Sequence, residues 1–251
     1  MMRVPNTPHG QRRFAAAVPT GHGIVLPAFH PALRAGRSLF PSRVFAPDEV
    51  QRLLKDGHQS RKIGKIITKG RRRGWPIYTL TLEERATCPR GCREWASCYG
   101  NNMQAAERID QGDAMFPVLE AELERLAAEF PTGFLVRLHV LGDFWSVRYV
   151  EFWAYMLHRF KALYLFGFTA HDPGSPIGEA IGLLMGHVGW ERAAFRYSGL
   201  SGKRHGSAVV LGPGEADPDA ILCPAQTGAT DCCATCALCW QSTRSIAFRR
   251  H

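Results

Sequence analysis

The sequence lacks any apolar run long enough to cross a membrane. Its longest such runs, as in "ALYLFGF" at 162–168, fall far short of the ~20 residues that a transmembrane helix needs. No secretory signal is evident either, because the apolar stretch at 24–29 is too short to form the core of one. We therefore expect a cytoplasmic protein with no membrane partner.

Several common functional motifs are also missing. The chain has no Walker A phosphate loop, no nucleophile elbow of the α/β-hydrolases, and no dinucleotide-binding glycine fingerprint followed by an acid. These absences argue against the corresponding nucleotide hydrolases, serine hydrolases and dehydrogenases.

Acidic residues are scarce near the start of the chain, and the net charge is +9. The first 47 residues contain no acid, and residues 61–74 carry seven Lys or Arg, again without an acid. Such a basic stretch favours an anionic partner, either nucleic acid or another phosphate-bearing substrate, although a solvated basic face is the alternative interpretation. Because prolines interrupt the start repeatedly, residues 1–45 are expected to be a flexible basic tail.

Cysteine is absent from most of the chain, and all 8 cysteines lie within residues 88–98 and 223–239. A chain of 251 residues, 45% of them hydrophobic, can fold without disulfide staples. Metal ligands, in contrast, must converge on a small centre, which close spacing in the sequence allows. The pattern therefore predicts metal binding.

Strand-like and helix-like segments alternate through the middle of the chain, which predicts a parallel sheet with helices outside it. The expected strands are too few for a closed eight-stranded barrel, so the predicted fold is α/β, as a partial TIM-like barrel or an open parallel βα sheet. We place this domain at 46–212, followed by a cysteine-rich metal-binding segment at 213–251. Strands are expected at 75–82, 133–142, 162–170, 192–198 and 207–212, and helices at 46–57, 101–109, 116–130, 146–160 and 175–188.

The second cysteine group resembles a ferredoxin-type ligand set. Cys233, Cys236 and Cys239 have C-x₂-C-x₂-C spacing, and Cys223 supplies a fourth thiolate. Tetrahedral zinc accepts the same four ligands, but zinc more often uses two separated C-x₂-C pairs, so the spacing favours an iron–sulfur cluster. Cys232 could replace Cys233 to give the radical S-adenosylmethionine (SAM) spacing, but no chain remains afterwards to form a barrel. We take Cys233 as the ligand.

The first cysteine group contains Cys88, Cys92 and Cys98, directly after the first expected strand. Three thiolates on a four-iron cluster would leave one iron open for a substrate or for SAM. The position is typical of radical-SAM enzymes, but the C-x₃-C-x₅-C spacing differs from their C-x₃-C-x₂-C, so we describe it as radical-SAM-like. The alternative is a structural zinc site with a fourth ligand from elsewhere.

Three further residues are candidates for contacting a cofactor. Asp143 follows the strand at 133–142, where ligands of parallel sheets bind, although a turn acid is the alternative interpretation. Arg137 precedes it in that strand, and the two-residue period places Arg137 and His139 on one face. His139 itself is more typical of a core histidine. Tyr99 follows Cys98 directly. No catalytic residue can be assigned.

Several motifs over residues 60–251 resemble the gene-product-88-like family, which occurs in phages and bacterial genomes. These motifs include "CYGN", "RLHVLGDF", "CPAQTG" and "CATCALCW". The resemblance implies a cytosolic, cysteine-ligated protein carried on mobile elements, but implies little about activity, because the family is largely uncharacterised. The matching residues are Cys88, Cys98, Tyr99, Arg137, His139, Gly142, Asp143, Cys223, Cys233, Cys236, Cys239, Trp240 and His251.

Together these features predict a protein with one or two 4Fe-4S clusters. The leading hypothesis is a radical-SAM-like enzyme that uses SAM and an electron donor on an anionic or nucleic-acid-related substrate. The alternative is a zinc-stabilised nucleic-acid-binding protein of phage or mobile-element origin, without catalysis.

Overall fold

The computed structural model describes residues 23–57, 60, 62–200 and 206–250 of the chain. Its main element within these residues is an eight-stranded sheet in the order β2-β3-β5-β6-β7-β8-β10-β9. The strands are β2 (Lys55–Asp56), β3 (Ile77–Thr79), β5 (Phe134–Leu138), β6 (Leu163–Thr169), β7 (Ala193–Ser198), β8 (Ser207–Leu211), β9 (Ala220–Leu222) and β10 (Ser245–Arg249).

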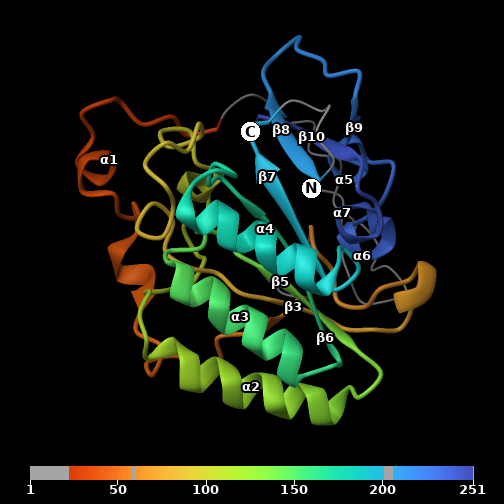
Figure 1. Ribbon diagram of the computed structural model, residues 1–251. Coiled ribbons are helices and arrows are strands. Elements are labelled where there is room, and N and C mark those ends of the chain that lie inside the picture. The colour runs from red at the N-terminus through yellow and green to blue at the C-terminus, as the bar shows by residue number, and fades with distance from the viewer. Residues whose placement is uncertain (1–22, 58–59, 61, 201–205, 251) are drawn as a thin grey trace, which may run out of the picture.

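Neighbouring strands of this sheet are parallel, except that β2 is antiparallel to β3. From β3 to β8 the strand order follows the chain order. The connecting helices α2 (Met115–Glu129), α3 (Val147–Arg159) and α4 (Pro176–Val188) lie side by side on the same side of the sheet (Figure 1). The expected α/β class with a mostly parallel sheet is therefore confirmed, in the form of an open sheet.

Local sequence signals define the start of two of the three long helices. Ser146 caps α3 by accepting the amide of Tyr149 at 3.1 Å, and Ser175 caps α4 by accepting the amide of Gly178 at the same distance. Pro176 occupies the first position of α4, where no amide hydrogen is needed. The helices expected at 116–130, 146–160 and 175–188 are thus confirmed to within a residue or two.

The helix expected at 46–57 is wrong. This segment consists of turns followed by β2, and the amides of Leu53 and Leu54 donate to the carboxylate of Glu122 at 2.7 and 2.8 Å. A carboxylate on α2 thus satisfies amides that a helix would have paired internally. Tertiary contacts override the local helical preference here.

The helix expected at 101–109 is also wrong. The chain forms a 3₁₀ turn, η4 (Tyr99–Asn102), and then the strand β4 (Arg108–Ile109), which pairs in parallel with β1 (Val44–Phe45). Long-range pairing with a segment near the start of the chain determines this structure, and no local pattern encodes it.

The expected tail at 1–45 is described from residue 23 onwards, where it differs from a flexible chain. It forms α1 (Pro31–Ala35), the turn η1 (Pro41–Arg43) and β1. The amide of Leu26 donates to the carbonyl of Ala96 at 3.1 Å, and Leu33 is buried. The described part of this segment therefore packs against the chain that carries the first cysteines. Residues 1–22 lie outside the described residues.

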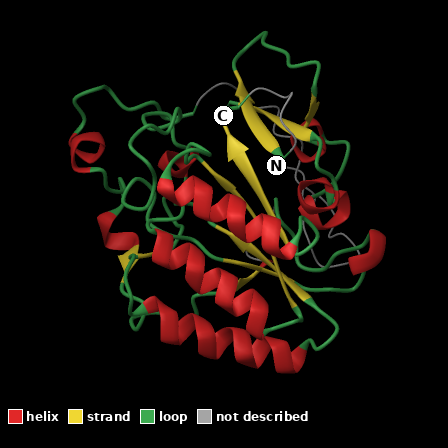
Figure 2. Ribbon diagram, in the orientation of Figure 1, coloured by secondary structure: helices red, strands yellow, loops and turns green. Residues whose placement is uncertain are grey.

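The two faces of the sheet bury different partners. The large core lies between the sheet and α2–α4, and the smaller core lies on the opposite face. There residues 62–75, with their turn η3 (Gly70–Arg72), pack against the short helices α6 (Cys233–Cys236) and α7 (Leu238–Gln241), and α5 (Pro224–Thr227) lies next to α6. Figure 2 shows the long helices stacked on one side of the strands and the short ones set apart from them.

The C-terminal segment contributes β9 and β10 to the sheet, which the sequence reasoning missed. Both strands are short and neither alternates clearly between apolar and polar residues. In the described part of the chain, no helix combines the length and hydrophobicity of a membrane span.

Candidate functional site

A cavity of about 1140 Å³ opens on the sheet face opposite the long helices. It lies between the first cysteine loop, residues 83–102, and the second cysteine segment, residues 223–241. Its lining includes five cysteines from these two parts of the chain: Cys92, Cys98, Cys223, Cys233 and Cys239. The fold thus brings two distant cysteine groups to one space.

A buried ion pair holds the first cysteine loop in shape. Arg108 Nε lies 2.7 Å from Glu84 Oε2, and neither side chain is exposed. Ser38 Oγ donates to Glu84 Oε1 at 2.8 Å. Arg108 also donates to three carbonyls of the loop and the residues that follow it, those of Gly100, Met103 and Ala106. The sequence reasoning missed this frame, although paired acids directly before the cysteines of a basic chain were a usable signal.

Arg85 fixes the turn that leads into the first cysteines. Its backbone has φ 66°, a left-handed conformation that costs a non-glycine residue about 1–2 kcal/mol. Its buried guanidinium donates to the Asn101 side chain and to the carbonyl of Trp95. These bonds tie the two ends of the loop together, so the strained turn persists.

The thiols of the first loop are held in their neutral form. Burial raises the pKa of Cys88, Cys92 and Cys98, to about 11 for Cys92. Neighbouring thiols and the carboxylate of Asp143 raise the pKa of Cys88 further. Cys92 and Cys98 line the large cavity, whereas Cys88 does not.

The second cysteine segment encloses a small cavity of its own. Four cysteines line it, namely Cys223, Cys233, Cys236 and Cys239, together with Trp240 and Ile246. Cys232 is not among them, because it is buried as the N-cap of α6, with its sulfur 3.7 Å from Thr235 Oγ1. The four cysteines selected by spacing are therefore the four that share one space.

The local charges affect these thiols in opposite ways. Burial raises the pKa of Cys233, Cys236 and Cys239, to about 11 for Cys239, and neighbouring thiols add to the rise. Arg137 lowers the pKa of Cys233 and Cys239. All eight cysteines lie in the described residues, and no two of them form a disulfide.

No group of three or more Cys, His, Asp or Glu side chains in the described residues is arranged to hold a metal ion. The four thiols of the second group line one small cavity, but the side chains of neither group converge on a centre. A metal or cluster at either group therefore remains a prediction, which rests on ligand chemistry and on the location of the thiols.

Arg196 organises the second cysteine segment. This fully buried side chain on β7 donates to the carbonyl of Cys239 at 3.2 Å and to that of Arg244 at 2.7 Å. Its other acceptors are the carbonyls of Ser207, Leu238 and Ser242. Carbonyls replace a carboxylate partner, and burial lowers the pKa of Arg196. The sequence offered no signal for this role.

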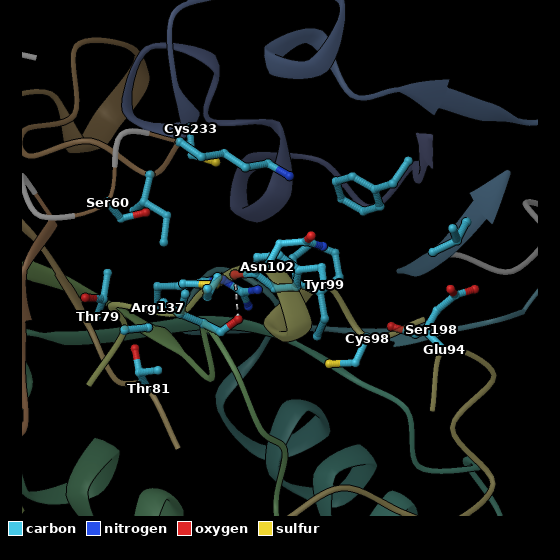
Figure 3. Close-up of a pocket in the computed structure, with 18 of the residues that line it drawn as sticks. Ser60, Thr79, Thr81, Glu94, Cys98, Tyr99, Asn102, Arg137, Ser198 and Cys233 are labelled. Carbon is cyan, nitrogen blue, oxygen red and sulfur yellow. Dashed lines mark hydrogen bonds between the residues drawn. The ribbon is translucent and has the colours of Figure 1, made fainter. Parts of the chain in front are cut away.

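Arg137 and Tyr99 both line the cavity. The Arg137 guanidinium lies 4.5 Å from the ring centroid of Phe168 and donates to the carbonyl of Leu138 at 3.0 Å. It makes no ion pair within the described parts of the chain. Figure 3 shows Arg137, Tyr99 and Cys98 on one side of the space and Cys233 on the other. Arg137 is thus a cation with room beside it.

Tyr99 has two environments. Its hydroxyl donates to the carbonyl of Val140 at 2.9 Å, and the surrounding walls raise the pKa of Tyr99 to about 12. Yet 42% of the residue is exposed, so solvent in the cavity reduces that desolvation. At neutral pH Tyr99 is a neutral phenol at the cavity wall.

Asp143 does not line the cavity. Its Oδ1 accepts the amide of Phe144 at 2.8 Å and its Oδ2 accepts the amide of Ala170 at 2.6 Å, so it joins the turns after β5 and β6. Burial raises the pKa of Asp143, while His171 and these hydrogen bonds lower it. The arrangement supports the alternative interpretation of Asp143 as a turn acid.

The expectation that Arg137 and His139 share a face is wrong. His139 lies beyond the end of β5 with φ 59°, and this left-handed backbone breaks the two-residue alternation. Its ring centroid lies 4.6 Å from that of Phe144, and its Nε2 lies 3.2 Å from Tyr149 Oη. Both contacts are on the side of the long helices. His139 is therefore a core histidine, as its sequence context indicated.

The large cavity carries excess positive charge. Its two acids are both paired, Glu107 with Lys55 and Glu94 with Arg250. The remaining cations make no ion pair among the residues described. The cations of the lining are Arg43, Lys55, Lys62, Arg137, Arg249 and Arg250.

The basic stretch at 61–74 does not form one solvated face. Arg72 is buried and donates to the carbonyl of Glu191, and Arg71 pairs with the carboxylate of Glu191 at 3.1 Å. Lys65 pairs with Asp56 at 3.6 Å, while Lys62 points its charge to the cavity side. Arg61 lies outside the described residues.

Comparison with known proteins adds no relative. No family model matches the chain, and neither a curated protein nor a solved structure is significantly similar to it. The resemblance to the gene-product-88-like family therefore stays a prediction from sequence motifs, and so does the origin on mobile elements that it implies.

Proposed function

We propose that this protein carries iron–sulfur clusters on its two cysteine groups and that the cavity between them is an active site of radical-SAM-like type. The observation that supports this most is the shared cavity, which is lined by Cys92 and Cys98 from one group and by Cys233 and Cys239 from the other. Two structural metal sites would not need to face a common space lined with unpaired cations.

The two groups differ in the number of thiols that they offer. Cys223, Cys233, Cys236 and Cys239 would hold a closed cluster, which suits an electron relay or a structural anchor. Cys88, Cys92 and Cys98 would leave one iron open, and this open iron is where SAM would bind. When bound, such a cluster supplies one-electron reduction, so an external electron donor is part of the proposal.

The protein residues would assist in two ways. Arg137 offsets the negative charge that Cys233 and Cys239 acquire on ligation. The raised pKa values mean that ligation must displace protons, so cluster loading is expected to weaken as pH falls.

The first test is anaerobic purification with iron, sulfide and zinc counted per chain. Two four-iron clusters would give about eight irons and eight sulfides, with broad absorbance near ~400 nm. Cys233→Ser is expected to remove about half of the iron. The matched variant Cys232→Ser should retain it, because Cys232 caps α6 outside the small cavity. Equal iron in both variants would contradict the ligand assignment. With SAM and a reductant added, the loaded protein is expected to cleave SAM.

The alternative function is a zinc-stabilised nucleic-acid-binding protein. It predicts zinc without sulfide, and binding to nucleic acid that weakens steeply with salt. The structure gives it less support, because two of the basic residues at 61–74 are engaged with Glu191. Zinc stoichiometry together with salt-sensitive binding would favour this alternative over the cluster enzyme.

A further inference from the structure

A row of alternating cationic and aromatic side chains lines part of the cavity. The Arg137 guanidinium lies over the ring of Phe168. The ring centroids of Phe168 and Phe248 are 5.4 Å apart, and the two ring planes meet at 74°. The Lys62 ammonium in turn lies 5.0 Å from the centroid of Phe248. These four residues come from β5, β6, β10 and the segment before β3, and all four belong to the cavity lining.

The row combines two recognition chemistries. Arg137 and Lys62 present charge without an acidic partner in the parts of the chain that the structure describes. The half-buried rings of Phe168 and Phe248 present apolar surface between these charges. A guanidinium recognises phosphate or carboxylate through paired hydrogen bonds, and aromatic rings stack on flat apolar groups. A ligand that uses the whole row must therefore carry both an anionic group and a flat ring.

The charge and the volume of the cavity further restrict the chemical class of the ligand. Six cations surround the cavity and its two acids are neutralised by two of them, which favours a dianionic group over a single carboxylate. The volume of about 1140 Å³ lies just above the range of about 300–1,000 Å³ that is typical of small-molecule sites. A volume of this order suits a small molecule better than a nucleic-acid strand.

We propose that the cavity binds a nucleoside phosphate, with the phosphate on Arg137 and Lys62 and the base against Phe168 and Phe248. This inference rests on the proposed function in treating the ligand as the substrate, whereas binding itself depends on the cavity. It names the chemical class of the substrate, which the cysteine motifs do not.

The test measures equilibrium binding of three probes to the full-length protein as purified anaerobically: adenosine monophosphate, adenosine and inorganic phosphate. The monophosphate is expected to bind more tightly than either fragment. Arg137→Gln should weaken its binding roughly 10- to 100-fold, through loss of charge-assisted hydrogen bonds. Lys62→Met should weaken it roughly threefold to tenfold.

Two further variants separate the phosphate and base contacts from general charge effects. Phe168→Leu should weaken the monophosphate roughly tenfold and leave inorganic phosphate unchanged, because it removes a stacking ring. Arg71→Gln removes the same charge from an exposed surface pair outside the cavity and should leave all three affinities unchanged. Circular dichroism spectra identify any variant that fails to fold, and the remaining variants still decide the question.

Specific outcomes would overturn the inference. They are no binding of the monophosphate at millimolar concentration, equal weakening by Arg71→Gln and Arg137→Gln, or, with a short single-stranded oligonucleotide as a fourth probe, binding of the oligonucleotide alone. Iron is counted on the same sample. Iron-free protein that binds the monophosphate would refute the cluster function and keep this inference, and iron-loaded protein that does not bind it would do the reverse.

Discussion

Gly142 is a residue that no other amino acid can replace without strain. It has φ 83°, and an added Cβ would lie 2.5 Å from Thr87 Oγ1 and 2.6 Å from Leu82 Cβ. We expect Gly142→Ala to lower the free energy of unfolding by about 2–4 kcal/mol, from the backbone strain and the overpacking. Urea denaturation measures the change.

The exposed helix residue Gly186 provides the matched control. Its Cβ would meet no atom within 4 Å, so Gly186→Ala should raise stability by about 0.5–1 kcal/mol. If both substitutions shifted stability in the same direction, the close approach at Gly142 would be refuted.

His139 gives the fold a pH dependence. Burial, with Arg137 and His171 nearby, lowers the pKa of His139 well below 6.5. The unfolded chain therefore binds a proton near pH 6.5 that the folded chain does not, so stability should fall as pH drops below this value, by at most about 1.4 kcal/mol per pH unit. In urea denaturation at pH 7, 6 and 5, the free energy of unfolding should fall less steeply for His139→Gln than for the unsubstituted protein. An unchanged slope would show that His139 takes up its proton at the same pH in the folded and the unfolded chain.

The buried pair of Glu84 and Arg108 is expected to be costly to break. Glu84→Gln should destabilise the protein by about 3 kcal/mol, because the Arg108 charge would stay buried without its partner. Glu129→Gln, in an exposed pair with Arg125 on α2, should cost at most about 0.5 kcal/mol. If thermal denaturation gave similar losses of stability for the two substitutions, the stabilising role of the buried Glu84–Arg108 pair would be contradicted.

Single residues also show how far the sequence could guide the site. The spacing of the second group separated Cys233 from Cys232 in the way that the small cavity does. The sequence could not show that Arg137 and His139 lie on opposite faces of the sheet. The cause is the left-handed backbone at His139, and such a backbone at a non-glycine residue has no sequence signature. The acceptors of Arg108 and Arg196 depend on tertiary structure and could not be predicted either.

At the scale of elements, Arg196 connects β7 to the helix turns of the second cysteine segment. Arg196→Lys keeps the charge but loses the planar guanidinium that reaches several carbonyls. The lost hydrogen bonds are expected to cost about 3 kcal/mol of stability in this segment. We expect faster amide hydrogen exchange over residues 236–244. Protection in α3 should be unchanged, and a uniform increase across the chain would instead indicate a global loss of stability.

The elements that the sequence predicted are those whose signals are local. The bounds of the capped amphipathic helices and of the strands around them were predicted to within a few residues. Their signals, hydrophobic periodicity and capping residues, lie within the segment itself. The segments at 46–57 and 101–109 were not, because their partners are Glu122 and β1, far away in the chain.

At the scale of the molecule, the described part of the N-terminal segment is a clamp on the first cysteine loop. Trp95 Nε1 and Arg90 Nη1 both donate to the carbonyl of Leu33, at 3.3 and 3.1 Å. Removing residues 1–37 should therefore raise hydrogen exchange over 85–101 and leave α3 protected. Unchanged exchange in the loop would show that the Glu84–Arg108 pair is sufficient to hold it.

The order of the last strands has a consequence for how the protein is made. β10 lies between β8 and β9, yet it follows both of them in the chain. During synthesis on a ribosome, β9 therefore has no neighbour in the sheet until residues 245–249 emerge. The second cysteine segment, residues 223–241, lies between β9 and β10 in the chain, so both of its ends are held in the sheet only after β10 has paired.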